Sequence, residues 1–219
     1  LLSPISALLD LPPLMSGKDG SDFLVYDRKQ VEKLNFLVEK YPQSEPALVR
    51  KLSKLTHQQP LYLGNSMPIR EWDLAISPQV ENLSVMANRG ANGIDGQVST
   101  FLGTCLEGKN NWALIGDLTV LYDLPSLWIS KQILPEHIFL VVLNNSGGMI
   151  FNRIFKSEYF LNRHEIEFSH WAKMWSWKYE KWSDIPLKNT LSGRTIIELV
   201  PQEQQTQLFW EGWDKDDRD

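Results

Sequence analysis

Two short stretches of the sequence decide its fold. Residues 111–117 read NWALIGD, and residues 138–148 read IFLVVLNNSGG. Each contains a continuous apolar run about the length of a strand, which is followed by glycine, aspartate or asparagine, residues that favour turns. Because the apolar residues are continuous and do not alternate with polar ones, the pattern is typical of parallel strands covered on both faces. Buried strands are therefore expected at 112–115 and 138–143.

Shorter runs elsewhere extend this pattern. Further strands are expected at residues 61–63, 83–86 and 194–200, and helices near residues 29–40 and 46–55, the second capped by Ser44. The alternation of strands and helices predicts an α/β fold, with a mostly parallel sheet and helices on both faces.

Apolar residues between the strands recur at helical spacing and predict two more helices. One carries Ile94, Val98, Leu102 and Cys105. The other carries Leu118, Leu121, Tyr122 and Trp128, although Pro125 disturbs its start.

Three regions follow from this pattern. Residues 1–55 are expected to be the end of a preceding region and a lead-in helix, and residues 56–201 form the main domain. Residues 202–219 are polar and acidic and predict a tail or a helix. The chain begins with Leu1 and not with Met, so we expect it to be a piece of a longer protein.

Composition excludes several classes of protein. Of the 219 residues, 42% are hydrophobic and 22% charged, as in globular proteins. The net charge of −5 argues against nucleic acid as a partner, and the longest apolar run, 138–143, is too short to span a membrane. The single cysteine, Cys105, and the lack of a recognisable signal peptide favour the cytoplasm.

Polar residues and glycines follow four of the expected strands. They form the loops 64–66, 88–90, 116–118 and 144–148. Because ligands bind beyond the carboxyl ends of strands in an open parallel sheet, we expect these loops to form one site.

Asp117 and Asn145 are the most specific feature of these loops. A carboxylate and a carboxamide after successive buried strands offer two oxygens to one cation, and Mg²⁺ prefers such ligands. At Gly147 and Gly148 the absence of a side chain lets the backbone approach closely. The alternative is that Asp117 caps the following helix and that residues 144–145 form a turn.

The spacing resembles that of a known family. Gly116-Asp117, followed after 27 residues by Asn145 as the second of two asparagines, is similar to the Gly-Asp-Gly…Asn-Asn motif of thiamine diphosphate-dependent enzymes. Leu118 replaces the third-position glycine, and this departure resembles the branch of the family that acts in menaquinone biosynthesis. Segments similar to that branch are GNSMPIR, NRGANGIDG, GDLTVLYDL and NSGGMIF, at residues 64–70, 88–96, 116–124 and 145–151.

The resemblance implies the fold of the diphosphate-binding (PP) domain of this family for residues 56–201. It implies Mg²⁺, with Mn²⁺ as a substitute, held by Asp117, Asn145 and the Gly147 carbonyl. The expected thiamine diphosphate contacts are Asn65, Ser66, Gly93, Ile94, Gly116, Leu118, Thr119 and Ile150. Ile94 would lie beneath the bent cofactor, unless it is an ordinary core residue.

The branch that the sequence resembles decarboxylates 2-oxoglutarate and adds the succinyl unit to isochorismate. Both substrates are dicarboxylates, and the expected substrate-binding residues are Ser66, Arg70, Arg89 and Phe151. Ile150 and Phe151 would form an apolar wall near the reacting carbon. The alternative for Arg70 and Arg89 is a solvated side chain or an ion pair with Asp73 or Asp95.

The resemblance further implies a homodimer or homotetramer, in which a pyrimidine-binding domain of a partner subunit supplies the activating glutamate. No glutamate of this chain matches that motif, so we expect the chain alone to be inactive. The alternatives are another thiamine diphosphate-dependent enzyme for a different 2-oxo acid, and a non-catalytic nucleotide-binding α/β module.

Several conspicuous residues are interpreted as structural. The four histidines have no spacing typical of a metal site, and four tryptophans are expected to form one packing cluster. These residues are His57, His137, His164, His170, Trp171, Trp175, Trp177 and Trp182. In the C-terminal region, Leu208, Phe209, Trp210 and Trp213 are expected to dock one helix face.

Overall fold

The structure is a computed structural model that describes residues 21–82, 84–90, 92–132, 135–152, 155 and 157–215. Residues 37–219 form one compact unit, and the residues before Leu37 belong to another. Helix α2 (Ser21–Lys40) crosses this boundary. The helix expected over 29–40 is therefore present, but it begins earlier. Residue 83, the expected start of the second strand, lies outside the described residues.

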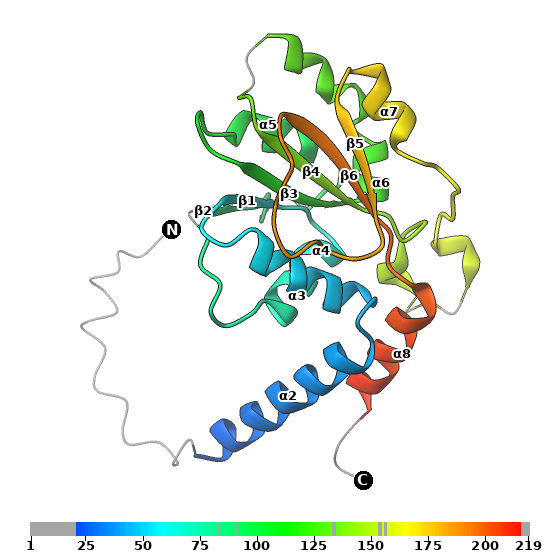
Figure 1. Cartoon of the computed structure of the whole chain (residues 1–219). Helices are drawn as coiled ribbons and strands as arrows, with labels where there is room; N and C mark the ends of the chain where they lie inside the picture. Colours follow the sequence, from blue (N-terminus) through cyan, green and yellow to red (C-terminus); the bar gives the residue numbers. More distant parts are fainter. Residues whose placement is uncertain are drawn as a thin grey trace, which may run out of the picture. The chain divides into compact units, whose positions relative to one another are not determined.

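A six-stranded sheet forms the centre of the second unit (Figure 1). All neighbouring strands are parallel, in the order β2-β1-β3-β4-β6-β5, which confirms the expected parallel sheet. The strands are β1 (Pro60–Leu63), β2 (Ser84–Met86), β3 (Asn111–Gly116), β4 (Ile138–Leu143), β5 (Lys178–Trp182) and β6 (Arg194–Leu199).

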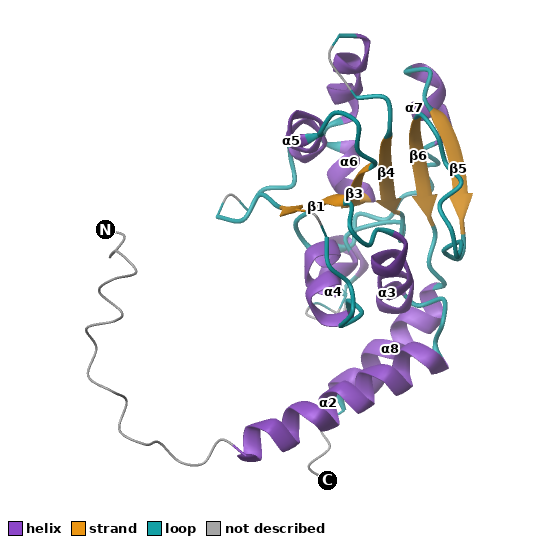
Figure 2. Ribbon diagram, turned by 60° about the vertical axis from the view of Figure 1, so that its left-hand side comes forward, coloured by secondary structure: helices purple, strands orange, loops and turns teal. Residues whose placement is uncertain are grey.

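Helices cover both faces of this sheet, as expected (Figure 2). One face carries α3 (Glu45–Leu55) and α4 (Met67–Ala75), and the other carries α5 (Gln97–Thr104), α6 (Asp117–Leu121) and α7 (Ser169–Met174). The remaining elements are the 3₁₀ helices η1 (Leu124–Lys131), η2 (Met149–Phe151) and η3 (Glu158–Phe160), and the last helix α8 (Glu203–Asp214). None of the helices in the described ranges is long and apolar enough to cross a membrane.

The position of β4 in the middle of the sheet explains why its sequence is apolar throughout. Leu140 and Val142 join the core on the α5 side, whereas Phe139 and Val141 join the core on the α3 side. Successive side chains of a strand point to opposite faces, so a strand between two helical layers needs apolar residues at every position.

Two of the expected helices differ from the structure. The helix expected from Ile94 begins at Gln97, after Gly96 with a φ of +68°, so Ile94 lies in the preceding loop. The helix expected over 118–128 is divided, because α6 ends at Leu121 and a 3₁₀ helix with Pro125 in its first turn follows.

The prediction of a single tryptophan cluster is wrong. Trp171 and Trp177 are buried on the α5 side, and Trp175 packs against them, but Trp182 packs against the core on the α3 side. Trp182 belongs to β5, which the sequence did not predict, because this edge strand is half-exposed and reads KYEKW.

The sheet order creates a crevice between β1 and β3. From β1 the chain passes to β2 on one side, and β3 then pairs with the other side of β1. The connections after β1 and β3 therefore leave in opposite directions, and ligands bind at such a point in open α/β sheets. The expected loops 64–66 and 116–118 lie there.

A buried glutamate on β6 holds the loop that follows β4. Glu198 is 1% exposed, and its carboxylate accepts hydrogen bonds from Asn144 Nδ2 (2.8 Å), the Phe168 N–H (2.9 Å) and the Tyr179 hydroxyl (2.8 Å). Three donors offset the cost of burying this polar group, so Glu198 joins β5, β6 and the loop after β4.

Replacing Glu198 by alanine is expected to lower the free energy of unfolding by about 3 kcal/mol or more, because each abandoned buried donor costs about 1–3 kcal/mol. Tyr179→Phe removes only one of the donors and is expected to cost about 1 kcal/mol. Urea unfolding measures both values. A loss below about 1 kcal/mol for Glu198→Ala would contradict this role.

Candidate functional site

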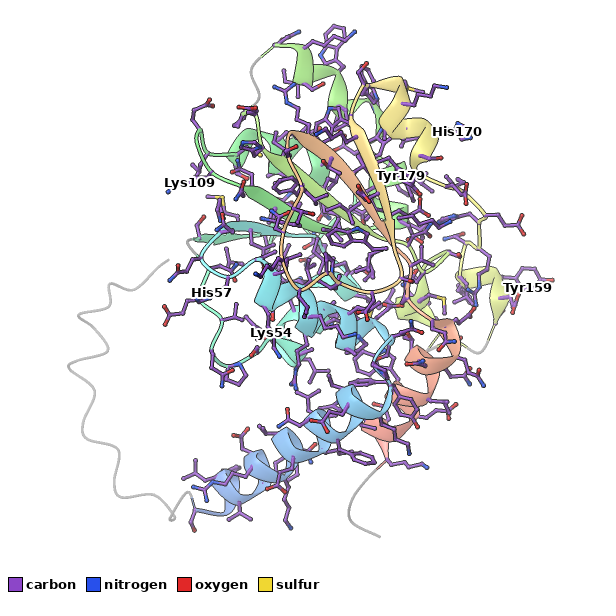
Figure 3. All side chains as sticks on the ribbon, viewed as in Figure 1. Lys54, His57, Lys109, Tyr159, His170 and Tyr179 are labelled. Carbon is purple, nitrogen blue, oxygen red and sulfur yellow. The ribbon has the colours of Figure 1, made fainter. Side chains whose placement is uncertain are left out.

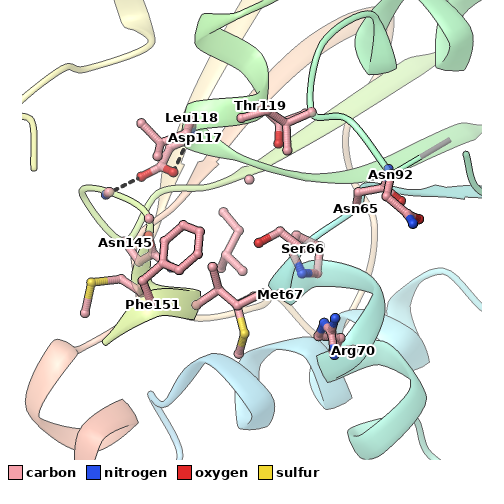
Figure 4. A pocket seen from close by; sticks show the side chains of 18 of the residues that line it. Asn65, Ser66, Met67, Arg70, Asn92, Asp117, Leu118, Thr119, Asn145 and Phe151 are labelled. Atoms are coloured by element: carbon pink, nitrogen blue, oxygen red, sulfur yellow. Dashed lines mark hydrogen bonds between the residues drawn. The ribbon is translucent and has the colours of Figure 1, made fainter. Parts of the chain in front are cut away.

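A cavity of about 380 Å³ lies at the carboxyl ends of β1, β3 and β4. Figure 4 shows its lining, with Asp117 and Arg70 on opposite sides in this view. Of the site residues expected from the sequence, all except Gly93 line it: Asn65, Ser66, Arg70, Arg89, Ile94, Gly116, Asp117, Leu118, Thr119, Asn145, Gly147, Ile150 and Phe151. The four loops therefore meet at one place.

Gly93 and Asn65 hold one wall of this cavity. Asn65 is 2% exposed, and its amide donates to the carbonyls of Gly93 (2.8 Å) and Asn88 (3.3 Å). Gln97, which the sequence analysis did not single out, accepts from the Asn65 N–H and donates to the Gly93 carbonyl. These bonds tie the loop before α5 to the loop after β1.

The Asp117 carboxylate lies at the end of β3 and is 2% exposed. Its Oδ1 accepts from the Leu118 N–H (2.6 Å), and its Oδ2 accepts from the Gly147 N–H (3.0 Å). His164 Nε2 lies 3.2 Å from Oδ2, within the distance of an ion pair but without hydrogen-bond alignment. Asp117 thus joins its own helix to the loop after β4.

Burial raises the pKa of the Asp117 carboxyl above its usual value, although the Leu118 N–H, His164 and the Gly147 N–H act in the opposite direction. Desolvation disfavours the charged form, and a nearby cation favours it. A divalent ion at this carboxylate would therefore supply the charge that the burial leaves uncompensated.

Asn145 presents an oxygen that fits such an ion. Its Nδ2 donates to Glu45 Oε1 at 3.0 Å, whereas its Oδ1 is buried and has no hydrogen-bond partner among the described residues. A buried carbonyl oxygen without a donor is costly in a protein unless something else fills its lone pairs. The Asp117 and Asn145 oxygens therefore fit a hard cation.

Gly147 meets two geometric demands. Its φ is +148°, and a Cβ atom would lie 2.4 Å from the Leu161 carbonyl oxygen, so only glycine fits. Its carbonyl accepts from the Met149 N–H at 3.0 Å, which leaves one lone pair for a ligand. No group of three His, Cys, Asp or Glu side chains in the described residues is arranged to hold a metal, so an ion at Asp117 would need amide, carbonyl or ligand oxygens.

Two serines in the loops of the site have positive φ angles, which residues other than glycine rarely adopt. Ser66 has a φ of +74° and Ser146 a φ of +64°. Such left-handed conformations cost non-glycine residues about 1–3 kcal/mol and are concentrated at functional sites. Ser66 directly precedes α4, and Ser146 lies between Asn145 and Gly147.

The start of α6 bears on the expected phosphate contacts. This helix has five residues, and the Leu118 N–H is already bonded to the Asp117 side chain. Thr119 lines the cavity and is 3% exposed. The contacts of Leu118 and Thr119 with a diphosphate stay predictions.

Arg70 and Arg89 lie at the exposed rim of the cavity. Neither guanidinium is bonded to a carboxylate of the described residues, so the alternative ion pairs with Asp73 or Asp95 do not form. Ile94 belongs to neither buried core and lines the cavity, which argues against the alternative that it is an ordinary core residue.

The apolar side of the cavity comes from η2, which carries Ile150 and Phe151. Phe151 is 40% exposed, and its ring lies 6.2 Å from that of Phe155. An apolar surface is therefore available beside the polar strand ends.

Two functional candidates escaped the sequence analysis. Glu45 lies 100 positions before Asn145, and no spacing rule connects them. His164 was interpreted as structural, but its imidazole lies against Asp117. The backbone N–H of His164 donates to the Ser146 carbonyl at 3.3 Å and holds the residue beside this loop. The other histidines are remote from the cavity: His57 and His170 are exposed (Figure 3), and His137 accepts from the Gly193 N–H.

Burial raises the pKa of Glu45 to about 7. Hydrogen bonds from Glu71 and Asn145 lower the value, and the negative charges of Asp117 and Glu203 raise it. The Glu71 carboxyl group lies close enough to Glu45 to affect this pKa.

The raised pKa of Glu45 predicts a pH dependence of stability. The folded state holds this proton more tightly than the unfolded state, so its contribution is full below pH 4.5 and is lost as the pH rises to about 7. The loss reaches at most about 3.5 kcal/mol, at about 1.4 kcal/mol per pKa unit. Glu45→Gln cannot titrate and lacks this decline.

Unfolding by urea at steps across this pH range, for wild type and Glu45→Gln, measures the difference. All other titratable groups are common to both proteins, so their direct contributions largely cancel in the comparison. Two curves that run parallel over the whole range would contradict the assignment.

Comparisons with known proteins give one consistent result. The chain is 48% identical over 193 residues to the 2-succinyl-5-enolpyruvyl-6-hydroxy-3-cyclohexene-1-carboxylate synthase of Bdellovibrio bacteriovorus, covering 87% of this chain and 37% of that protein. It is 35% identical over 180 residues to the synthase of the same name from Akkermansia muciniphila, covering 76% and 34%. No protein-family model matches.

A solved structure agrees in fold. A candidate thiamin diphosphate-dependent enzyme from Mycobacterium smegmatis matches 74% of this chain and 32% of its own, with a TM-score of 0.51 and 19% identity. The chain spans about a third of the length of the curated relatives that it matches.

Proposed function

Since the chain belongs to the 2-succinyl-5-enolpyruvyl-6-hydroxy-3-cyclohexene-1-carboxylate synthase family, we propose that it forms the diphosphate-binding part of such an enzyme. The proposed enzyme is a transferase that uses thiamine diphosphate and Mg²⁺, or Mn²⁺ in its place. It decarboxylates 2-oxoglutarate and joins the succinyl unit to isochorismate in menaquinone biosynthesis. We also propose a cytoplasmic location.

The single observation that carries the proposal is the convergence of Asp117 and the unsatisfied Asn145 oxygen on one cavity. In the proposal these two oxygens and the Gly147 carbonyl bind the cation, which neutralises a diphosphate at the carboxyl ends of the strands. Thiamine diphosphate, when bound, supplies the electron sink for decarboxylation of a 2-oxo acid. Ser66 and Ile94 would orient the cofactor.

The substrate end of the proposed site lies at Arg70 and Arg89. Their guanidinium groups are exposed and form no ion pair with the described residues, which suits the carboxylates of both proposed substrates. Ile150 and Phe151 offer an apolar surface that excludes water, and loss of CO₂ is favoured where a carboxylate is poorly solvated.

The cation assignment is tested by calorimetric titration of the purified protein with thiamine diphosphate and Mg²⁺. Asp117→Ala is expected to weaken binding about 10- to 100-fold or more, and EDTA is expected to do the same to wild type. Asp73→Ala is the matched control, because Asp73 is exposed on α4 and does not line the cavity. Binding by Asp117→Ala that equals wild type would refute the assignment.

The proposed reaction also predicts a requirement for further protein. The activating glutamate is proposed to come from a pyrimidine-binding domain of a partner subunit in a homodimer or homotetramer. The 219-residue chain alone is therefore expected to give no turnover, and the whole enzyme is expected to require isochorismate as acceptor. Assays of CO₂ release with a panel of 2-oxo acids, with and without isochorismate, check both points. Turnover by the isolated chain would contradict the first point. CO₂ release by the whole enzyme that is equally fast without isochorismate would contradict the second, and a preference for another 2-oxo acid would contradict the proposed donor.

A further inference from the structure

We propose that Glu45 is a positioning residue that turns the Asn145 side chain, so that its oxygen and not its NH₂ group faces the cation. The proposal rests on the function proposed above, in which Asn145 is a metal ligand. Its direct support is the hydrogen bond from Asn145 Nδ2 to Glu45 Oε1, 3.0 Å long.

A carboxamide needs such guidance, because its two ends have nearly the same size and opposite chemistry. Rotation about the last side-chain bond exchanges the oxygen, which binds cations, with the NH₂ group, which repels them. An acceptor beside the NH₂ group selects one of the two orientations. In this structure Glu45 provides that acceptor, and the oxygen is left buried without a partner among the described residues.

The cavities on the two sides of Asn145 support this orientation. Asn145 lines the cavity that contains Asp117 and also a second cavity of about 700 Å³ towards α8. Glu45 lines only the second. Because the two ends of a planar carboxamide diverge, a bond from Nδ2 to Glu45 turns Oδ1 away from Glu45.

Glu45 is itself held in place. It is 2% exposed at the first turn of α3, which Ser44 caps through the Ala47 N–H. Its own N–H donates to Thr206 Oγ1 at 3.0 Å, and its carboxyl group lies near that of Glu71. A side chain restrained at both its backbone and its head group can impose an orientation on its neighbour.

The proposed role needs an acceptor oxygen and not a charge. A carboxyl group keeps an acceptor oxygen whether or not it is protonated, and so does the amide of glutamine. Glu45→Gln retains the acceptor and offers an NH₂ donor to Glu71. Glu45→Met has a similar length but no acceptor, so the two variants separate positioning from simple occupancy of space.

The first experiment measures Mn²⁺ binding in the presence of thiamine diphosphate by the loss of the free-ion EPR signal. Glu45→Met is expected to weaken Mn²⁺ affinity about 10- to 100-fold, as for other residues that orient metal ligands, and Glu45→Gln to stay within about threefold of wild type. Glu107→Met is the matched control: it makes the same substitution at an exposed glutamate that lines neither cavity, and its affinity is expected to stay within about twofold of wild type.

The second experiment observes the Asn145 NH₂ group by NMR without metal or cofactor, with its signals assigned by their loss in Asn145→Ala. Slow exchange with solvent in wild type and Glu45→Gln, and fast exchange in Glu45→Met, is expected. Fast exchange in wild type would overturn the proposal even if Glu45→Met failed to fold.

The two experiments separate the inference from the function on which it rests. If wild type binds Mn²⁺ and Glu45→Met binds it equally well, the positioning role is wrong and the proposed function stands. If wild type binds no Mn²⁺ with thiamine diphosphate, the metal assignment fails, and with it the role of Glu45 towards a metal.

Discussion

One buried carboxylate connects the elements on which the candidate site depends. Asp117 follows β3, and its carboxylate accepts from the Leu118 N–H of its own helix and from the Gly147 N–H in the loop after β4. Because β3 and β4 are adjacent and parallel, their carboxyl ends lie side by side. N–H groups that follow the two strands can therefore bond to the same carboxylate. The same burial that allows them raises the pKa of the carboxyl, and a cation beside it would favour the charged form.

The two consecutive asparagines after β4 have different tasks. Asn144 donates to Glu198 on β6 and anchors the loop to the sheet, whereas Asn145 donates to Glu45 at the start of α3. Successive side chains at the end of a strand point in opposite directions, so one serves the core and the next serves the cavity. Two buried glutamates, far apart in sequence, thus hold one short loop from two sides.

Much of this arrangement could be predicted from local patterns. The central strands β3 and β4 appear in the sequence as continuous apolar runs. Glycine, asparagine and aspartate residues indicate the loops that follow them. The failures have local causes too. The edge strand β5 carries charged residues and lacks the apolar signal, and Pro125 divides the helix that was expected to continue past Leu121.

By itself, the sequence determined the parallel sheet, its two helical layers and most of the residues that line the cavity. Strands buried on both faces require continuous apolar runs, and the turns that end them require particular residue types, so both can be recognised in a short stretch of sequence. Only the tertiary structure decided the contacts of Glu45, Glu71 and His164, which come from distant segments. It also decided that Gly93 supports the wall and does not line it. Contacts between distant positions depend on how helices pack on the sheet, and no spacing along one chain records that.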